Sequence, residues 1–228
     1  MRERKEINTA RVTGVFVKRA EDRPVRLTRR GRRHRPSGVY FSVKCGYGVP
    51  WESRNELHSF WSAEVDSNVL RYRAQPHTLE MVIDGRRHHY TPDRQDWMAD
   101  GRIEIIEIKD TFDRESDDLY AEKIRRAEAI YVGLGFRFRV IARKEIEREP
   151  AFRAVQTIQF YRRAQISPQA ILHVQRALSL GQRSLGDVVD AIGPTSTATC
   201  QAYAMIVRRL LGIDLSNGLS RSSAVWAI

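Results

Sequence analysis

Hydrophobic and polar positions along the middle of the chain follow recognisable periods. Residues 51–65 show the three- and four-residue spacing of an amphipathic helix, capped near its start by Ser53 or Asn55. Residues 69–75 form a short strand that Pro76 ends. Residues 78–83 and 86–91 flank Asp84-Gly85, and this arrangement predicts a β-hairpin.

A second group of elements predicts a sheet with a crossover. Residues 103–108 are a β-branched run after a turn at Asp100-Gly101, which indicates a buried central strand. Residues 115–134 have helical spacing and end at glycines, and residues 136–142 again form a strand. The order strand, helix, strand predicts a mixed α/β sheet within a domain covering residues 38–149.

After Pro150 the pattern becomes helical. Helices are expected at 151–164, 168–179, 184–192 and 197–211, followed by a short extended tail at 213–216. Compact helices with a strand-like tail predict a winged-helix or helix-turn-helix domain covering 150–228. Such a domain binds either DNA or a protein partner, and both remain open, because Arg208 and Arg209 are the only close basic pair on the expected recognition helix.

The net charge of the chain is +11, and the charged residues are distributed unevenly along it. Residues 1–39 carry 13 Lys and Arg against 4 Asp and Glu, whereas residues 40–149 carry 18 against 21. We therefore interpret residues 1–37 as a basic, mobile arm that becomes ordered on an anion, with DNA favoured over RNA or acidic protein. The arginines expected to contact DNA are Arg29, Arg30, Arg32, Arg33 and Arg35.

Sequence features also narrow the cellular setting. No run approaches the length of a membrane helix, and the N-terminus lacks the apolar stretch of a signal peptide. Cys45 and Cys200 are far apart and have no metal-binding spacing, so they are expected to be reduced thiols. A cytoplasmic protein is the expectation.

One spacing indicates phosphodiester hydrolysis. A divalent metal activates water and neutralises transition-state charge, and Mg²⁺ prefers carboxylate ligands. Asp93 follows a proline, and after thirteen residues the chain continues Glu107-Ile108-Lys109. Residues two apart on a strand share a face, and a turn at Asp100-Gly101 would return Glu107 toward Asp93. This predicts a Mg²⁺ site, which Mn²⁺ would also fill. The alternative is a structural interpretation, in which Asp93 is a turn residue and Glu107 and Lys109 form an ion pair on the surface.

Neighbouring polar residues have plainer interpretations. His88 and His89 are expected to be strand residues or phosphate contacts, because no further His or Cys stands at ligand spacing. Glu104 falls on the face opposite Glu107 and is expected to be exposed. Three aromatic residues are assigned to the core: Trp51, Phe60 and Trp61.

These motifs resemble the TnsA family of transposon endonucleases, members of the PD-(D/E)XK class. The resemblance covers most of the chain and is carried by segments 38–44, 52–57, 69–76, 90–93, 100–101, 107–109, 119–131, 136–146, 184–188 and 210–215. It implies a restriction-endonuclease-like mixed sheet flanked by helices, followed by a winged-helix-type domain. It also implies that Glu56 is a metal ligand, and Gln75 aligns with the family's Gln before Pro. Gln75 would either orient water or phosphate or form a structural hydrogen bond.

The resemblance further implies a role in transposition. Such a subunit hydrolyses double-stranded DNA at the 5′ ends of a transposon, while a transposase cuts the 3′ ends and an ATPase regulator contacts the complex. It would act in the bacterial cytoplasm, associated with the nucleoid. Two alternatives remain open: a stand-alone nuclease of the same fold in restriction, phage or repair, and a non-catalytic DNA-binding or assembly factor.

Overall fold

The computed structural model describes residues 2–8, 13–19, 24, 36–83, 85–110, 118–179 and 181–228. These residues form a mixed α/β structure, which confirms the predicted class. The chain divides into two compact units. Unit 1 is Met1–Tyr40, Gly48–Leu57 and Leu70–Lys144, and unit 2 is Phe41–Tyr47, His58–Val69 and Glu145–Ile228. Among the described helices, none combines the length and apolarity needed to cross a membrane.

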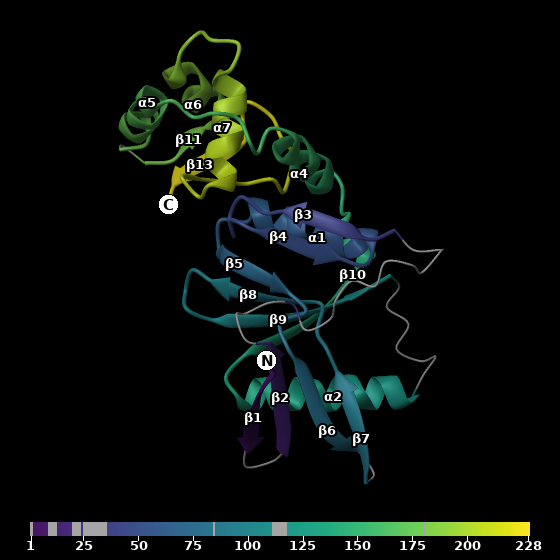
Figure 1. Ribbon diagram of the computed structural model, residues 1–228. Helices are drawn as coiled ribbons and strands as arrows, with labels where there is room; N and C mark the ends of the chain where they lie inside the picture. The colour runs from purple at the N-terminus through teal and green to yellow at the C-terminus, as the bar shows by residue number, and fades with distance from the viewer. Residues whose placement is uncertain are drawn as a thin grey trace. The chain divides into compact units, whose positions relative to one another are not determined.

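Sheet 1 of unit 1 is antiparallel, with the strand order β1-β2-β6-β7. Its strands are β1 (Arg2–Asn8), β2 (Thr13–Arg19), β6 (Thr78–Ile83) and β7 (Arg86–Tyr90). Helix α2 (Asp118–Gly133) lies across this sheet (Figure 1). Alternate strand residues and one stripe of the helix bury the same cluster, which includes Phe16, Leu79, Met81, Ala127, Ile130 and Tyr131.

The N-terminal strands correct the predicted arm. Residues 2–8 and 13–19 pair with each other, and β2 continues into sheet 1 through β6. Phe16 and Val17 are buried, so this part of the chain supplies core side chains to unit 1. The basic composition concealed a hairpin, because the positive charges of β1 lie at an exposed sheet edge.

Sheet 2 of unit 1 has the strand order β10-β9-β8-β5. Its strands are β5 (Val69–Ala74), β8 (Arg94–Met98), β9 (Ile103–Lys109) and β10 (Arg137–Ala142). β9 and β10 are parallel and are connected through α2, so the predicted crossover is confirmed. β8 and β9 form an antiparallel hairpin whose turn contains Gly101 at φ 85°, a conformation that favours glycine.

Strand β8 was not predicted, because its sequence Arg-Gln-Asp-Trp-Met shows no apolar alternation. Arg94 and Asp96 are nevertheless buried, since they form an ion pair at 2.8 Å on one face of the strand. Four further elements lie in the described part of the chain before residue 147: the paired strands β3 (Gly38–Phe41) and β4 (Gly48–Trp51), helix α1 (Arg54–Val65) and helix α3 (Arg143–Ile146).

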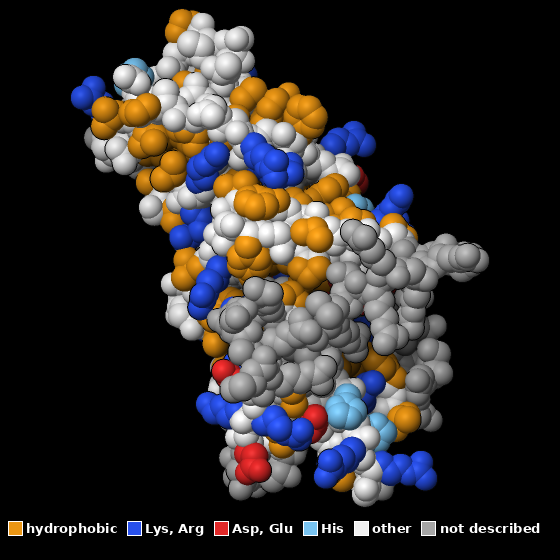
Figure 2. All heavy atoms as spheres, viewed as in Figure 1, with side chains coloured by type: hydrophobic (Ala, Val, Ile, Leu, Met, Phe, Trp, Pro, Cys, Tyr) orange, Lys and Arg blue, Asp and Glu red, His pale blue; other side chains and the backbone are white. Residues whose placement is uncertain are grey.

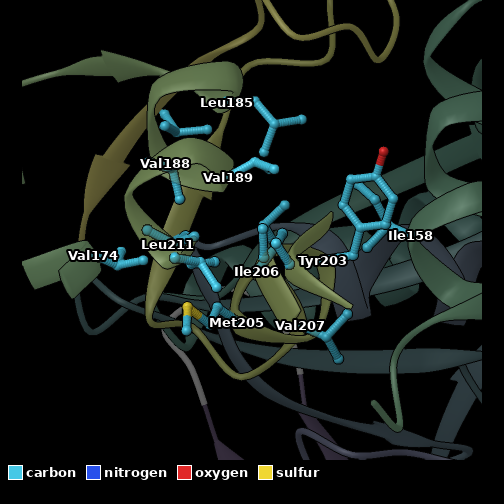
Figure 3. Close-up of a cluster of buried hydrophobic side chains, with 14 of the residues drawn as sticks. Ile158, Val174, Leu185, Val188, Val189, Tyr203, Met205, Ile206, Val207 and Leu211 are labelled. Atoms are coloured by element: carbon cyan, nitrogen blue, oxygen red, sulfur yellow. The ribbon is translucent and has the colours of Figure 1, made fainter. Parts of the chain in front are cut away.

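Unit 2 consists mainly of helices around one hydrophobic cluster. Its C-terminal elements are α4 (Ala151–Phe160), α5 (Pro168–Leu178), β11 (Arg183–Ser184), α6 (Leu185–Ile192), α7 (Ala198–Val207), β12 (Leu211–Ile213) and β13 (Ala224–Ala227). Ser167 caps α5, and Ser184 with Asp187 forms a capping box on α6. Figure 3 shows side chains from α4, α5, α6, α7 and β12 meeting in the cluster.

Two boundaries in unit 2 differ from the prediction. Helix α7 ends at Val207 rather than 211, and Arg209 adopts φ 56°, which turns the chain into β12. Of the expected tail at 213–216, only Ile213 lies in a strand, because β12 ends there; β12 belongs to an antiparallel sheet with the order β11-β13-β12. Unit 2 also takes in residues 58–69, because Val65 joins its core and Gln159 Nε2 donates to the carbonyl of Trp61.

Candidate active site

Strand β9 ends with two charged side chains on one face of sheet 2. Glu107 and Lys109 alternate with Ile108 and therefore point to the same side, as the spacing predicts. Lys109 Nζ lies 2.7 Å from Glu107 Oε1. The Glu107 side chain is 8% exposed and that of Lys109 is 30% exposed, so the ammonium group keeps access to solvent.

Asp93 is brought to Glu107 by the β8–β9 hairpin. It lies one residue before β8, not at the end of the preceding strand, because β7 ends at Tyr90. Arg94 pairs with Ile106, and this register continued by one residue places Asp93 opposite Glu107. Asp93 Oδ2 accepts a hydrogen bond of 2.7 Å from the backbone N–H of Ile108. The turn at Asp100-Gly101 thus returns the chain as expected.

Glu56 lies in the first turn of α1 and closes its N-terminus. Ser53 Oγ accepts from the Glu56 backbone N–H at 3.2 Å, while the Glu56 carboxylate accepts from Ser53 Oγ at 3.2 Å and from the Glu52 backbone N–H at 3.0 Å. Glu56 is only 7% exposed, so it is not the solvated helix carboxylate that the sequence also allowed.

Gln75 joins the site through its main chain. Its backbone N–H donates to the carbonyl oxygen of Asp93 at 2.9 Å, which ties the end of β5 to the start of β8. Its φ of 45° lies in the left-handed region, where a non-glycine residue costs about 1–3 kcal/mol. The residue is buried, and its strain is located directly beside Asp93.

The three carboxyl groups influence one another electrostatically. Burial raises the pKa of Asp93 well above its ordinary value, and the charges of Glu107 and Glu56 raise it further. Burial is also the main cause of the raised pKa of Glu56, to which Glu107 contributes. The Ile108 hydrogen bond and Lys109 oppose the shift at Asp93. One ammonium group therefore stands among three acidic groups, an excess that a bound cation would offset.

Two tyrosines that the sequence did not single out hold Glu107. Tyr90 Oη donates to Glu107 Oε2 at 2.7 Å, and Tyr120 Oη donates to Glu107 Oε1 at 2.5 Å. Tyr90 was recognisable only as the neighbour of Thr91-Pro92-Asp93, at the end of a strand. Tyr120 had no local signal, because it comes from α2 and reaches the site through the tertiary fold.

The chemistry of these donors fits a hard divalent cation. Glu56, Asp93 and Glu107 are the residues that would hold it, because Mg²⁺ and Mn²⁺ prefer carboxylate oxygens. Within the described residues, however, no three His, Cys, Asp or Glu side chains form a group that could hold a metal ion as they stand. Glu107 faces Lys109 and the tyrosines, and Glu56 faces Ser53. Metal binding would therefore require side chains to turn from these partners.

No family model matches the chain, and no curated protein matches it. What the site can do is derived from its own geometry and chemistry.

Other predicted residues have mixed outcomes. The five arginines expected to contact DNA, Arg29, Arg30, Arg32, Arg33 and Arg35, lie outside the described residues. His88 and His89 are residues of β7, where they pair with β6, and His89 Nδ1 lies 3.9 Å from Glu80 Oε1. Phe60 is fully buried, as predicted.

Glu104 is a correction. It was expected to be exposed, but it is 2% exposed and lies on the opposite face of β9 from Glu107. Arg137 and Arg139 on the adjacent parallel strand β10 each donate to its carboxylate at 3.2 Å. The sequence pattern of β9 alone could not reveal partners that come from another strand.

A basic and aromatic group lies on the Glu107 face of sheet 2. Trp97 pairs with Ile103, which shares a face with Glu107 by alternation. The Arg71 guanidinium lies 4.2 Å from the centroid of the Trp97 ring, and that of Arg73 lies 5.2 Å away. Arg71 is exposed. In the view of Figure 2, Lys and Arg side chains are spread over both units, with few acidic side chains among them.

The basic pair expected on the recognition helix is engaged within unit 2. Arg208 Nη1 donates to the carbonyls of Arg162 and Ala204, each at 3.1 Å, and Arg209 Nε donates to the carbonyl of Ser67 at 2.9 Å. Residues 201–207 of α7 are all buried. Helix α7 therefore offers little side-chain surface to the groove of a duplex.

Proposed function

We propose that this chain is a metal-dependent DNA endonuclease of the PD-(D/E)XK class, acting as a TnsA-type subunit of a transposition machinery. The observation that supports it most is that the β8–β9 hairpin brings Asp93 opposite Glu107, which contacts Lys109, while the charge of Glu56 raises the pKa of Asp93. Asp93, Glu107 and Lys109 belong to one hairpin, whereas Glu56 comes from the start of α1, which precedes that hairpin in the sequence. Burial and the neighbouring carboxylates raise the pKa of Asp93 and of Glu56, and such perturbed carboxyl groups are typical of sites built for chemistry.

The order of elements supports a restriction-endonuclease-like fold for unit 1. A helix that carries Glu56 in its first turn precedes a β-hairpin, and the two strands β9 and β10 are joined by the crossover helix α2. In unit 2, the order α5, β11, α6, α7, β12, β13 with the sheet β11-β13-β12 is that of a winged-helix domain.

The residues of the site have distinct roles in this proposal. Glu56, Asp93 and Glu107 would hold Mg²⁺ or Mn²⁺, which supplies an activated water and neutralises charge on the phosphate. Lys109 keeps part of its surface in solvent, so its ammonium group can orient the attacking water and offset negative charge on the phosphate. Gln75 holds the Asp93 main chain in place through its backbone N–H.

The substrate is inferred from charge complementarity on the same sheet face. Arg71 and Arg73 lie over Trp97, which is four residues from Asp93 along β8 and thus about 13 Å away. That spacing corresponds to about four nucleotides of one strand along the axis of a duplex, so a phosphate backbone cut at the carboxylates would pass these guanidinium groups.

The winged-helix unit is assigned to protein contacts in this proposal. Helix α7 is covered, and Arg208 and Arg209 donate to carbonyls within the unit, which disfavours reading of DNA by this helix. The transposase and the ATPase regulator implied by the TnsA resemblance are the proposed partners.

Plasmid cleavage tests the function. The full chain is incubated with supercoiled DNA and Mg²⁺ or Mn²⁺, alone and with the proposed transposase and ATPase partners. Metal-dependent nicking that requires the partners, and that Lys109→Ala abolishes while DNA binding persists, is expected. Lys144→Ala, an exposed lysine of α3, is the matched control.

The other outcomes separate the alternatives. Robust cleavage by the chain alone would indicate a stand-alone nuclease. DNA binding with no cleavage in any mixture would indicate a non-catalytic assembly factor. Cleavage by Lys109→Ala at the wild-type rate would show that the site is placed wrongly.

A further inference from the structure

The carboxylate of Glu107 is more fully occupied than a metal ligand should be. Oε1 receives hydrogen bonds from Tyr120 Oη at 2.5 Å and faces Lys109 Nζ at 2.7 Å. Oε2 receives Tyr90 Oη at 2.7 Å. Each carboxylate oxygen has two lone pairs, so the donors on Oε1 use both of its positions, whereas Oε2 retains one.

The two tyrosines differ in how firmly they are held. Tyr90 is 4% exposed, ends a strand of sheet 1, and packs edge-on against Tyr131 and Phe138 with ring centroids 6.4 and 6.3 Å apart. Its hydroxyl cannot leave Glu107 without disturbing the core cluster to which the ring belongs.

Tyr120 is attached more loosely. It is the third residue of α2 and is half-buried. Its ring lies against two ammonium groups, with Lys109 Nζ 4.1 Å and Lys123 Nζ 5.3 Å from the centroid. Lys109 therefore contacts both the ring of Tyr120 and the carboxylate that Tyr120 binds, and the three groups form one closed unit.

We propose that Tyr90 is a fixed positioning residue for Glu107 and that Tyr120 is a releasable latch on it. Tyr120 occupies Glu107 Oε1 while the site is empty of cation, and its hydroxyl leaves when a divalent cation takes that oxygen. Tyr90 stays on Oε2 and keeps the carboxylate oriented. The latch rests on the proposed function, because it assumes that Glu107 binds a metal.

The proposal predicts opposite effects for two equivalent substitutions. Tyr120→Phe removes the hydroxyl that competes with the cation but keeps the ring beside Lys109, so Mn²⁺ affinity should increase about three- to tenfold. Tyr90→Phe removes the group that orients the ligand, so Mn²⁺ affinity should decrease about tenfold or more. A purely structural role for both tyrosines would move both affinities downward.

Mn²⁺ titration of the full chain, followed by the electron paramagnetic resonance signal of free Mn²⁺, measures this without any cleavage assay. Tyr161→Phe in unit 2 is the matched control and should leave the affinity unchanged. If Tyr90→Phe fails to fold, as judged by circular dichroism, the comparison of Tyr120→Phe with wild type and the control decides.

The outcomes distinguish the latch from the function it rests on. Wild-type binding with Tyr120→Phe equal or weaker would overturn the latch and leave the metal site standing. Mn²⁺ binding by Tyr120→Phe but not by wild type would support the latch most strongly. Absence of binding in every chain would overturn the metal site and the latch together.

Discussion

The two faces of strand β9 carry buried charge in different ways. On one face, Glu104 receives both Arg137 and Arg139. On that face of the neighbouring strand β8, Asp96 is paired with Arg94 at 2.8 Å. On the other face, Glu107 lies with Asp93 and Glu56 within electrostatic reach, and Lys109 is the cation that contacts it.

This difference separates structural charge from charge kept for chemistry. A buried carboxylate that has its own guanidinium is satisfied inside the fold and needs nothing further. Carboxyl groups such as Asp93 and Glu56, whose pKa values are raised by burial and by neighbouring carboxylates, are unfavourable in their charged form, and a bound cation would offset this. Where each buried carboxylate has its own arginine, loss of either partner should lower the stability of the protein. Where carboxylates gather without such partners, a substitution that removes one of them should stabilise the protein and abolish its activity.

The largest effect is expected from a substitution on the face of sheet 2 that carries Glu107. Asp93→Asn keeps an oxygen that can accept from the Ile108 N–H but removes one negative charge, so cleavage should fall about a thousandfold or more. In EDTA, the same change should raise the free energy of unfolding by about 1–2 kcal/mol, because a buried charge is removed and repulsion from Glu107 and Glu56 is relieved. Plasmid cleavage and urea denaturation measure the two. Loss of activity together with loss of stability would contradict the comparison.

The next largest effect is expected from a substitution on the opposite face, where Arg94 pairs with Asp96. Arg94 and Asp96 are both buried, with side chains 7% and 2% exposed, so Arg94→Leu leaves an uncompensated charge and should cost about 3–5 kcal/mol. Replacement of both residues by leucine should recover most of that loss. Urea denaturation of the single and double variants tests this.

Glu104→Gln tests the same face of sheet 2 and should cost less stability than Arg94→Leu. Arg137 and Arg139 are 54% and 42% exposed, so water replaces the lost carboxylate and the cost should be only about 1 kcal/mol. A double Arg94/Asp96 variant as unstable as Arg94→Leu alone would show that packing, not charge, governs this face.

The comparison also explains what the sequence could reveal. Alternation along residues 103–109 and the glycine turn at 101 were sufficient to place Glu107, Lys109 and Asp93 together, because both are local signals. The proximity of Glu56 to them came from the family resemblance. The burial of Glu104 escaped prediction because its arginine partners stand on β10, and strand β8 escaped because its buried residues Arg94 and Asp96 are charged and show no apolar alternation.

Tyr120 and the N-terminal hairpin were missed for a related reason. The β1–β2 segment has a high positive charge, which indicated an arm, yet Phe16 packs with His77 and Tyr131 at the centre of unit 1. Local composition reports the exposed side of such a strand, while the long-range contacts of its few apolar residues decide whether it folds.

The smallest expected effect is a change with pH in the free energy of unfolding. Asp93 and Glu56 have raised pKa values, mainly because they are buried, so the folded chain binds more protons than the unfolded chain between their ordinary and raised values. The free energy of unfolding contributed by these groups therefore falls as pH rises from about 4 through the raised pKa values. Asp93→Asn lacks this term at position 93, so its stability advantage over wild type in EDTA should be near zero at about pH 4 and grow with pH. Denaturation curves at half-unit pH steps measure it, and an advantage that does not change with pH would mean that neither burial nor the neighbouring carboxylates destabilise the charged form of Asp93.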